Sequence, residues 1–202
     1  MPALLRGFPF ESRASAEVAA MQPWTNKPGA NAQPADSFDF RRLSIDEGRR
    51  HPAFALIGES YDIWRTLATA AGVPLSSAAR PTVFARLLPF TAWMTVIDDG
   101  ADFEWVSLGD LQVNHFGRDI AGLRMSEVVE VPMDSSRLVA VHRTAVLERD
   151  AVFLLAHLDD QGTHYEWAGV LLPLADAAGR VTDLLGVSKS LNRLERPRDA
   201  LD

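Results

Sequence analysis

The chain has 202 residues, with 20 basic and 27 acidic side chains and no cysteine. The absence of cysteine excludes disulfide frameworks, thiolate metal sites and thiol nucleophiles. The net charge of −7 argues against nucleic acid as a partner, because nucleic-acid binders present a basic face.

The N-terminal residues do not have the pattern of a targeting signal. Arg6, Gly7 and Pro9 interrupt the apolar residues, whereas a secretory signal contains an unbroken apolar stretch of about 7–15 residues. A membrane-spanning helix requires about 20 apolar residues, and the apolar stretches of this chain are far shorter. We therefore expect a cytoplasmic protein without a membrane span.

Residues 1–51 are expected to form a mostly flexible N-terminal leader. Prolines recur through this segment without a sustained apolar period, so it buries too little surface to offset the entropy cost of ordering it. Its last part carries Phe38, Phe40, Leu43 and Ile45, which would allow that part to dock on the domain.

The folded domain is expected to start near Pro52 with an amphipathic helix. Apolar residues recur at helical spacing and predict one buried stripe. These residues are Phe54, Ile57, Tyr61, Trp64 and Leu67. Gly72 and Pro74 end the helix, and a short helix over 81–88 follows.

The remainder of the domain is predicted to consist of strands and one long helix. Segments rich in β-branched and aromatic residues, separated by glycine and aspartate turns, predict the strands. They span residues 90–97, 103–108, 152–158, 165–174 and 181–188. A helix over 135–149 precedes the last three strands, and residues 189–202 form a charged tail.

This order of elements predicts an α+β fold in which short helices lie on one face of an antiparallel sheet. In the first strand Trp93 and Ile97 lie on the face opposite to Ala92 and Met94, although a solvated sheet face should be polar. We therefore expect the second face to be covered, either by the helix around Trp64 or by a second copy of the chain.

Four segments resemble an alphaproteobacterial PAS-type sensory domain family. They are Tyr-Asp-Ile-Trp at 61–64, Arg-Leu-Leu-Pro at 86–89, Phe-Gly-Arg-Asp-Ile-Ala-Gly at 116–122 and Leu-Leu-Pro-Leu at 171–174. The resemblance covers about residues 52–187, and the glycine-arginine segment is its most specific part. It implies a PAS-like domain over 52–188, with an N-terminal flanking helix and a five-stranded antiparallel sheet that cups a small pocket. It also implies sensing or signalling rather than catalysis.

The cofactor stays unknown under this resemblance. The family often carries arginine in the second strand, where this chain has Trp105-Val106-Ser107, so a ligand shared with the family is not implied. Flavin photosensors of this fold form a cysteine adduct, and the yellow photoreceptors tether their chromophore through cysteine. A chain without cysteine can do neither.

An apolar pocket with few polar groups is the first candidate site. Its candidate residues are Met94, Trp105, Phe116, Arg118, His142 and Tyr165. Aromatic residues at strand spacing are equally typical of a plain core. For Arg118 we favour an ion pair within its own loop over an anionic ligand. For His142 we favour a buried core histidine over an axial haem ligand, although haem-binding PAS domains place their ligand on such a helix.

His157 and His164 flank a predicted hairpin turn and are weak candidates for a metal site. If they pair across the hairpin, their Cβ atoms would lie about 5 Å apart, with Asp159 and Glu166 nearby. Metal sites require three or four convergent ligands, so we favour a polar hairpin end and assign no metal.

We expect a stand-alone sensory or adaptor domain that contacts a signalling protein and forms a homodimer, because no nucleotide-binding or catalytic motif occurs. The candidate partner surfaces are the stripe residues Phe54, Tyr61 and Trp64, and the sheet face marked by Trp93 and Ile97. One alternative is a small α+β-cup enzyme with Asp110, His115 or His142 as acid or base. Another is an interaction scaffold without a ligand.

Overall fold

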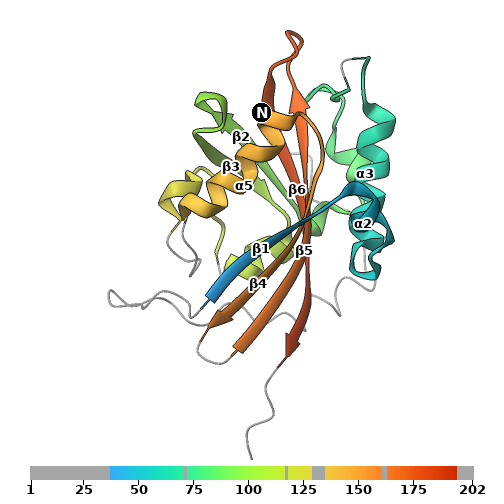
Figure 1. Ribbon diagram of the computed structural model, residues 1–202. Helices are drawn as coiled ribbons and strands as arrows, with labels where there is room; N and C mark the ends of the chain where they lie inside the picture. The colour runs from blue at the N-terminus through green and yellow to red at the C-terminus, as the bar shows by residue number, and fades with distance from the viewer. Residues whose placement is uncertain (1–36, 71, 117, 129–134, 161–162, 195–202) are drawn as a thin grey trace, which may run out of the picture.

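The computed structural model describes residues 37–70, 72–116, 118–128, 135–160 and 163–194. In this part of the chain the fold is α+β, as predicted, with one antiparallel sheet and helices packed on it (Figure 1). The rest of the predicted leader and tail lies outside the described residues. None of the described helices is long and apolar enough to cross a membrane.

The sheet has six strands in the order β1-β4-β5-β6-β2-β3. They are β1 (Ser37–Leu43), β2 (Thr91–Ile97), β3 (Asp102–Leu108), β4 (Val152–Asp160), β5 (Thr163–Ala175) and β6 (Val181–Leu194). The α-helices are α2 (Ile45–Arg50), α3 (Ala55–Leu67), α4 (Asp110–Phe116) and α5 (Ser135–Glu148). Short 3₁₀ turns are η1 (Pro52–Phe54), η2 (Pro81–Phe84), η3 (Leu88–Phe90), η4 (Asp98–Gly100) and η5 (Met125–Glu127).

β1 and α2 belong to the folded domain, which corrects the prediction that residues 1–51 form a leader. β1 pairs antiparallel with β4 along its whole length. Ser44 and Glu47 then cap α2 reciprocally, and the Glu47 carboxylate accepts a hydrogen bond from the Ser44 amide at 2.8 Å. The sheet therefore has six strands rather than the five expected. At the other end β6 continues to Leu194, beyond the predicted start of the tail.

Two hydrophobic clusters lie on opposite faces of the sheet, because alternate side chains of each strand point to opposite sides. The first cluster lies under α3. It includes Phe54, Ile57, Tyr61, Trp64, Phe84, Leu87, Phe90, Phe153, Val170, Leu172 and Leu185. The second cluster involves α5 and η5. It includes Met94, Phe103, Trp105, Ile120, Met125, Ala145, Val152, Leu154, Leu171 and Leu184.

The helix α3 covers the second sheet face over β5 and β6, but it leaves the strand of Trp93 and Ile97, for which the sequence predicted a cover, to one side. Phe54, Tyr61 and Trp64 are 1%, 7% and 0% exposed, and the Trp64 indole donates to the carbonyl oxygen of Pro173 in β5 at 2.7 Å. Because these three side chains pack against their own sheet, they do not form the exposed partner surface that the sequence predicted.

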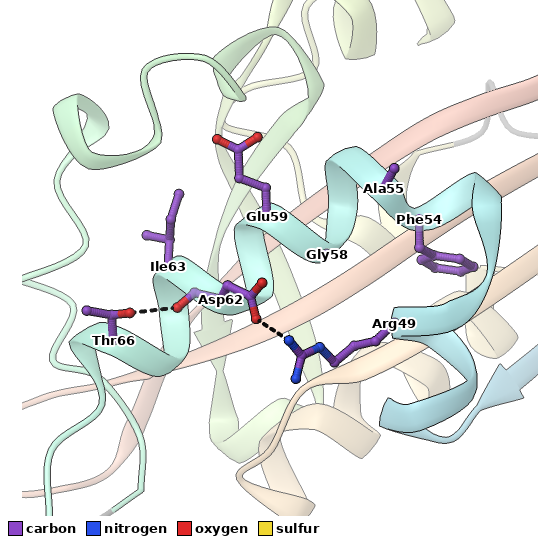
Figure 2. Close-up of a pocket in the computed structure, with 8 residues that line it drawn as sticks. All are labelled: Arg49, Phe54, Ala55, Gly58, Glu59, Asp62, Ile63 and Thr66. Atoms are coloured by element: carbon purple, nitrogen blue, oxygen red, sulfur yellow. Dashed lines mark hydrogen bonds and ion pairs between the residues drawn. The ribbon is translucent and has the colours of Figure 1, made fainter.

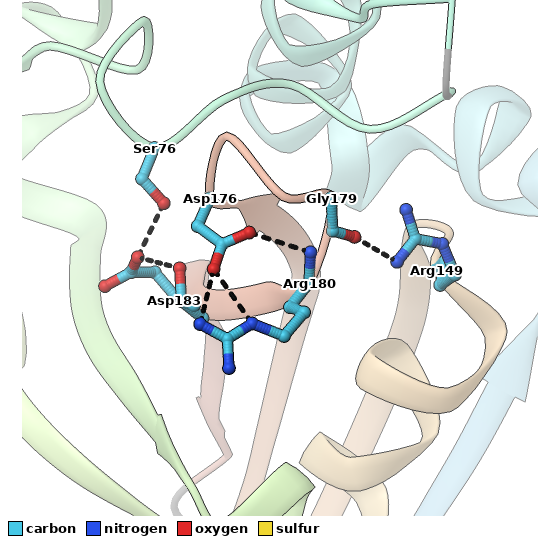
Figure 3. A network of polar contacts seen from close by, with 7 residues as sticks. Ser76, Arg149, Asp176, Gly179, Arg180 and Asp183 are labelled. Carbon is cyan, nitrogen blue, oxygen red and sulfur yellow. Dashed lines mark hydrogen bonds and ion pairs between the residues drawn. The ribbon is translucent and has the colours of Figure 1, made fainter.

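A polar network holds elements of both layers at one end of the sheet (Figure 3). The Ser76 hydroxyl donates to the Asp183 carboxylate at 2.5 Å, which fastens the segment after α3 to β6. Arg149, which follows α5, donates to the carbonyl oxygen of Gly179 at 2.7 Å. Gly179 belongs to the β5–β6 turn, which a 2.9 Å ion pair between Asp176 and Arg180 closes. The two layers are therefore fixed to the same hairpin.

Candidate ligand-binding site

Four of the six predicted pocket residues meet in the second cluster, on the α5 side of the sheet. Met94 from β2 and Trp105 from β3 are 1% and 5% exposed, and alternation along the two strands puts them on the same face. His142 of α5 lies with its ring centroid 6.5 Å from that of Trp105. Phe116, at the end of α4, packs edge-on against Trp105 at 5.6 Å.

The indole N–H of Trp105 is buried without a hydrogen-bond partner. Among the described residues no other buried side-chain nitrogen or oxygen lacks one. A tryptophan N–H is a donor only and usually finds a partner when it is buried. Leaving such a donor unpaired costs about 1–3 kcal/mol, so a buried unpaired group points to a molecule that pairs with it.

His142 supplies the complementary group next to Trp105. Its Nδ1 lies 2.8 Å from the carbonyl oxygen of Leu138. Because a carbonyl only accepts, Nδ1 carries the hydrogen and Nε2 is left as an acceptor. Burial lowers the pKa of His142 to about 4, against a smaller opposing effect of the bond to Leu138. The ring is therefore neutral near pH 7, with Nε2 able to accept a hydrogen bond.

The side chains around Trp105 and His142 are apolar. Phe103 of β3 is fully buried and its ring lies 5.5 Å from that of His142. The buried carboxylate of Asp102 is already used: it accepts from the Ser126 hydroxyl at 2.6 Å and from the Phe103 amide at 2.8 Å. These bonds fasten η5 to β3 and leave the interior of the cluster without a described charge.

The predicted pocket residue Arg118 is not part of this cluster, and only the backbone of Tyr165 is described. Arg118 is exposed. Tyr165 lies on β5 and pairs with Leu158 on β4, and its side chain lies outside the described residues. Its backbone is six residues from Leu171, a member of the cluster, which corresponds to about 20 Å along a strand. Of the predicted pocket residues, Met94, Trp105, Phe116 and His142 therefore lie close together, whereas Arg118 lies at the surface.

Two of the three residues of the enzyme alternative, Asp110 and His142, lie in different environments. Asp110 is exposed in the first turn of α4, whereas His142 is buried beneath α5. His115 lies on α4, and its side chain is outside the described residues. A general base must reach the proton that it takes, and the described geometry provides no such acid–base pair.

At the predicted hairpin end, His157 contacts Glu166 on the neighbouring strand. His157 Nδ1 lies 3.0 Å from Glu166 Oε1 across β4 and β5, and both side chains are about one-third exposed. The side chain of His164 is outside the described residues. Within the described part of the chain, no three histidine or acidic side chains gather as metal ligands would.

The β2–β3 pair keeps an apolar surface on the α3 side. The helix α3 packs over β5 and β6 and leaves this pair to one side (Figure 1). Trp93 is half-buried against the first cluster, and its indole donates to Asp183 at 3.2 Å. Ile97 is half-buried, and Val106, which the sequence prediction missed, is 48% exposed beside the bulge in this strand pair.

A shallow hollow of about 460 Å³ lies along the outer face of α3 (Figure 2). Its lining residues are Arg49, Phe54, Ala55, Gly58, Glu59, Asp62, Ile63 and Thr66. Arg49 pairs with Asp62 at 3.0 Å, and the Phe54 side chain is buried in the core. The hollow is open and its charges are partly paired with one another, so it is a weaker candidate than the cluster beneath α5.

Comparisons with known proteins assign no family to the chain. No family model and no curated protein matches the chain. An RNA-binding Light-Oxygen-Voltage receptor is 18% identical over 77% of this chain and 39% of its own length, with a TM-score of 0.42. A Light-Oxygen-Voltage domain studied with a flavin analogue is 14% identical over 58% of this chain and 89% of its own, with a TM-score of 0.41. The PAS domain of a Colwellia psychrerythraea protein is 14% identical over 53% of this chain and 92% of its own length, with a TM-score of 0.38. At these values the similarity concerns the fold alone.

Proposed function

We propose that this chain is a sensory domain that binds a small molecule in the cluster of Met94, Trp105, Phe116 and His142. The single observation that carries the proposal is the unpaired, buried indole N–H of Trp105. Aromatic side chains and few polar groups are the usual composition of a small-molecule site. The PAS-type resemblance of the sequence is consistent with sensing.

An ordered water is the competing occupant. A buried water needs two to four polar partners, and the described cluster offers the Trp105 N–H and the His142 Nε2. Water would satisfy the donor without any sensing role. Binding of an organic molecule therefore has to be measured directly.

The test compares native and denaturing mass spectra of the full chain, together with its absorption spectrum. We expect a non-covalent mass that disappears on denaturation, and that the Trp105→Phe variant loses. Trp93→Phe is the matched control, because it also removes an indole N–H but one that pairs with Asp183 outside the cluster. A wild-type protein without bound mass, which also fails to bind any added aromatic compound, would refute the proposal.

We propose further that the output is a protein contact through the β2–β3 surface, with a second copy of the chain as the partner. The support is the exposed Val106 at the bulge opposite Trp93, together with the half-buried Ile97 further along β2, on a strand pair that α3 does not cover. A twofold interface brings the same patch of both copies together, so apolar side chains there are self-complementary. Light scattering should show a dimer that Val106→Arg converts to a monomer, whereas a wild-type monomer at tens of micromolar would contradict this part.

A further inference from the structure

We infer that β1 makes a second contact between copies of this chain, in which the β1 strands of two copies pair antiparallel around Phe40. The inference goes beyond the proposed function, because it involves neither the ligand cluster nor the β2–β3 surface. Three observations carry it: the open outer edge of β1, the way the strand is held in the fold, and the charges that it presents.

β1 is an edge strand, at the end of the sheet opposite to β3 (Figure 1). A loop partly covers the outer edge of β3: the Trp105 amide donates to the carbonyl oxygen of Leu123 at 3.0 Å, and the Gly122 amide donates to that of Trp105 at 2.7 Å. Within the described ranges of the chain, β1 pairs with β4 alone and no backbone hydrogen bond reaches its outer edge. Such an edge presents a row of unpaired N–H and C=O groups to which another strand can add.

β1 is held in place from both layers of the fold. Leu43 packs in the first cluster, on the α3 side of the sheet. Arg42 points to the opposite face, where its guanidinium donates two hydrogen bonds to the Glu148 carboxylate at the end of α5. Because the strand is already ordered, less conformational entropy is lost when another strand joins it.

The exposed charges of β1 are complementary to those of a second β1. Asp39 and Arg41 are both exposed and, being two residues apart, lie on the same face of the strand. Neither takes part in an ion pair with another described residue. In an antiparallel pair centred on Phe40, Asp39 of each copy lies directly opposite Arg41 of the other. Opposite charges in this position stabilise a strand pair, and the twofold relation provides the charge pair twice.

The same charges disfavour the other ways of pairing. A twofold antiparallel contact keeps each face of the sheet on its own side, so it has to be centred on one residue. A centre at Asp39, Arg41 or Arg42 would place two like charges directly opposite each other, which is destabilising. A centre at Phe38 would leave Asp39 and Arg41 without an opposite charge. The pattern therefore selects the register around Phe40.

The test measures self-association of the full chain by sedimentation equilibrium, in the Val106→Arg background so that the β2–β3 contact does not contribute. Because β1 has seven residues, the contact is small, and we expect association between about 10 µM and about 1 mM. Arg41→Asp and Asp39→Arg should each weaken this association at least about tenfold, because each substitution places like charges opposite one another twice.

Two recombinations distinguish strand pairing from a loss of folding. An equimolar mixture of the Arg41→Asp and Asp39→Arg proteins should associate as the parent protein does, since two carboxylates then face two guanidinium groups. The double variant with Asp39→Arg and Arg41→Asp should also associate on its own. Arg86→Asp reverses an exposed charge outside the sheet and, as the matched control, should leave the association unchanged.

Hydrogen exchange shows whether the edge itself is the contact. The β1 amides that point away from β4 should exchange more slowly as the protein concentration rises. If they are already protected in the dilute, monomeric protein, another part of the same chain covers the edge, and the inference is wrong.

The outcomes separate this inference from the proposed function. A Val106→Arg protein that stays monomeric up to about 1 mM, single charge reversals without effect, or a mixture that does not associate would each overturn the β1 contact and leave the β2–β3 contact and the ligand site as they are. A wild-type dimer that Arg41→Asp dissociates and Val106→Arg does not would support the β1 contact and contradict the β2–β3 contact.

Discussion

The indole nitrogen of Trp64 donates to the carbonyl oxygen of Pro173 at 2.7 Å and so joins α3 to the sheet. Pro173 has no amide hydrogen to give to a neighbouring strand, and it lies on β5 beyond the last residue that β4 pairs with. Proline is therefore tolerated here. The carbonyl that would otherwise be buried without a donor is satisfied by the tryptophan.

Replacing Trp64 should show how much its hydrogen bond and packing contribute to the stability of the fold. We expect Trp64→Phe to destabilise the protein by about 3 kcal/mol, because it leaves the Pro173 carbonyl unpaired and creates a small cavity. Urea unfolding followed by circular dichroism would measure the change. Trp93→Phe, at a half-buried position, should cost about 1 kcal/mol, and equal effects of the two substitutions would contradict the prediction.

Two glycines should respond in opposite ways to substitution by alanine. A Cβ at Gly109 would lie 1.9 Å from the carbonyl oxygen of Leu88, whereas a Cβ at Gly58 would meet nothing within 4 Å. Gly109→Ala should destabilise by at least about 2 kcal/mol, since backbone has to move. Gly58→Ala, in the middle of α3, should stabilise by about 0.5–1 kcal/mol through helix propensity. Thermal unfolding of both variants would test the pair, and a tolerated Gly109→Ala would refute the close contact.

Most of the sheet could be predicted because its signals are local. Strands β2 to β6 and the helices α3 and α5 carry alternating or helical apolar patterns, with turns such as Asp98-Asp99-Gly100 between them. β1 carries only a short alternation, at Phe38 and Phe40, and it directly follows a proline-rich stretch. Its stability comes from pairing with β4, which places Leu43 opposite Phe153, 110 residues away in the sequence. A local apolar pattern does not reveal that two strands so far apart in the sequence pair with each other.

The candidate site could also be predicted only in part: its residues follow from the sequence, but their contacts do not. The sequence identified Met94, Trp105, Phe116 and His142, because aromatic residues at alternate strand positions and on a crossover helix tend to converge. Phe103 could also have been found, since it shares the face of Trp105 by alternation. The missing partner of the Trp105 N–H and the orientation of the His142 ring follow from three-dimensional packing, and no sequence pattern encodes either.

The edge strand β1 should contribute through its last residue. Leu43 is 3% exposed and packs in the first cluster, so Leu43→Ala should cost about 2–3 kcal/mol. The neighbouring Arg41 is exposed, and Arg41→Ala should change stability by less than about 0.5 kcal/mol. Urea unfolding would compare the two variants. A Leu43→Ala protein as stable as wild type would mean that β1 is dispensable for the fold.

The buried imidazole of His142 should make the protein sensitive to mild acid. Burial lowers its pKa from 6.5 to about 4 in the folded state, so the unfolded chain takes up a proton at a higher pH than the folded one. Stability should therefore fall as the pH drops from about 6.5 to about 4 and should lose no more from this group below that range. At pH 4.5 the loss relative to pH 7.5 amounts to about 2.5 kcal/mol. His142→Asn keeps a donor near the Leu138 carbonyl but does not titrate, and its loss over the same interval should be smaller by that amount. Urea unfolding at both pH values would measure it, and parallel losses in wild type and variant would show that His142 is not buried as a neutral ring.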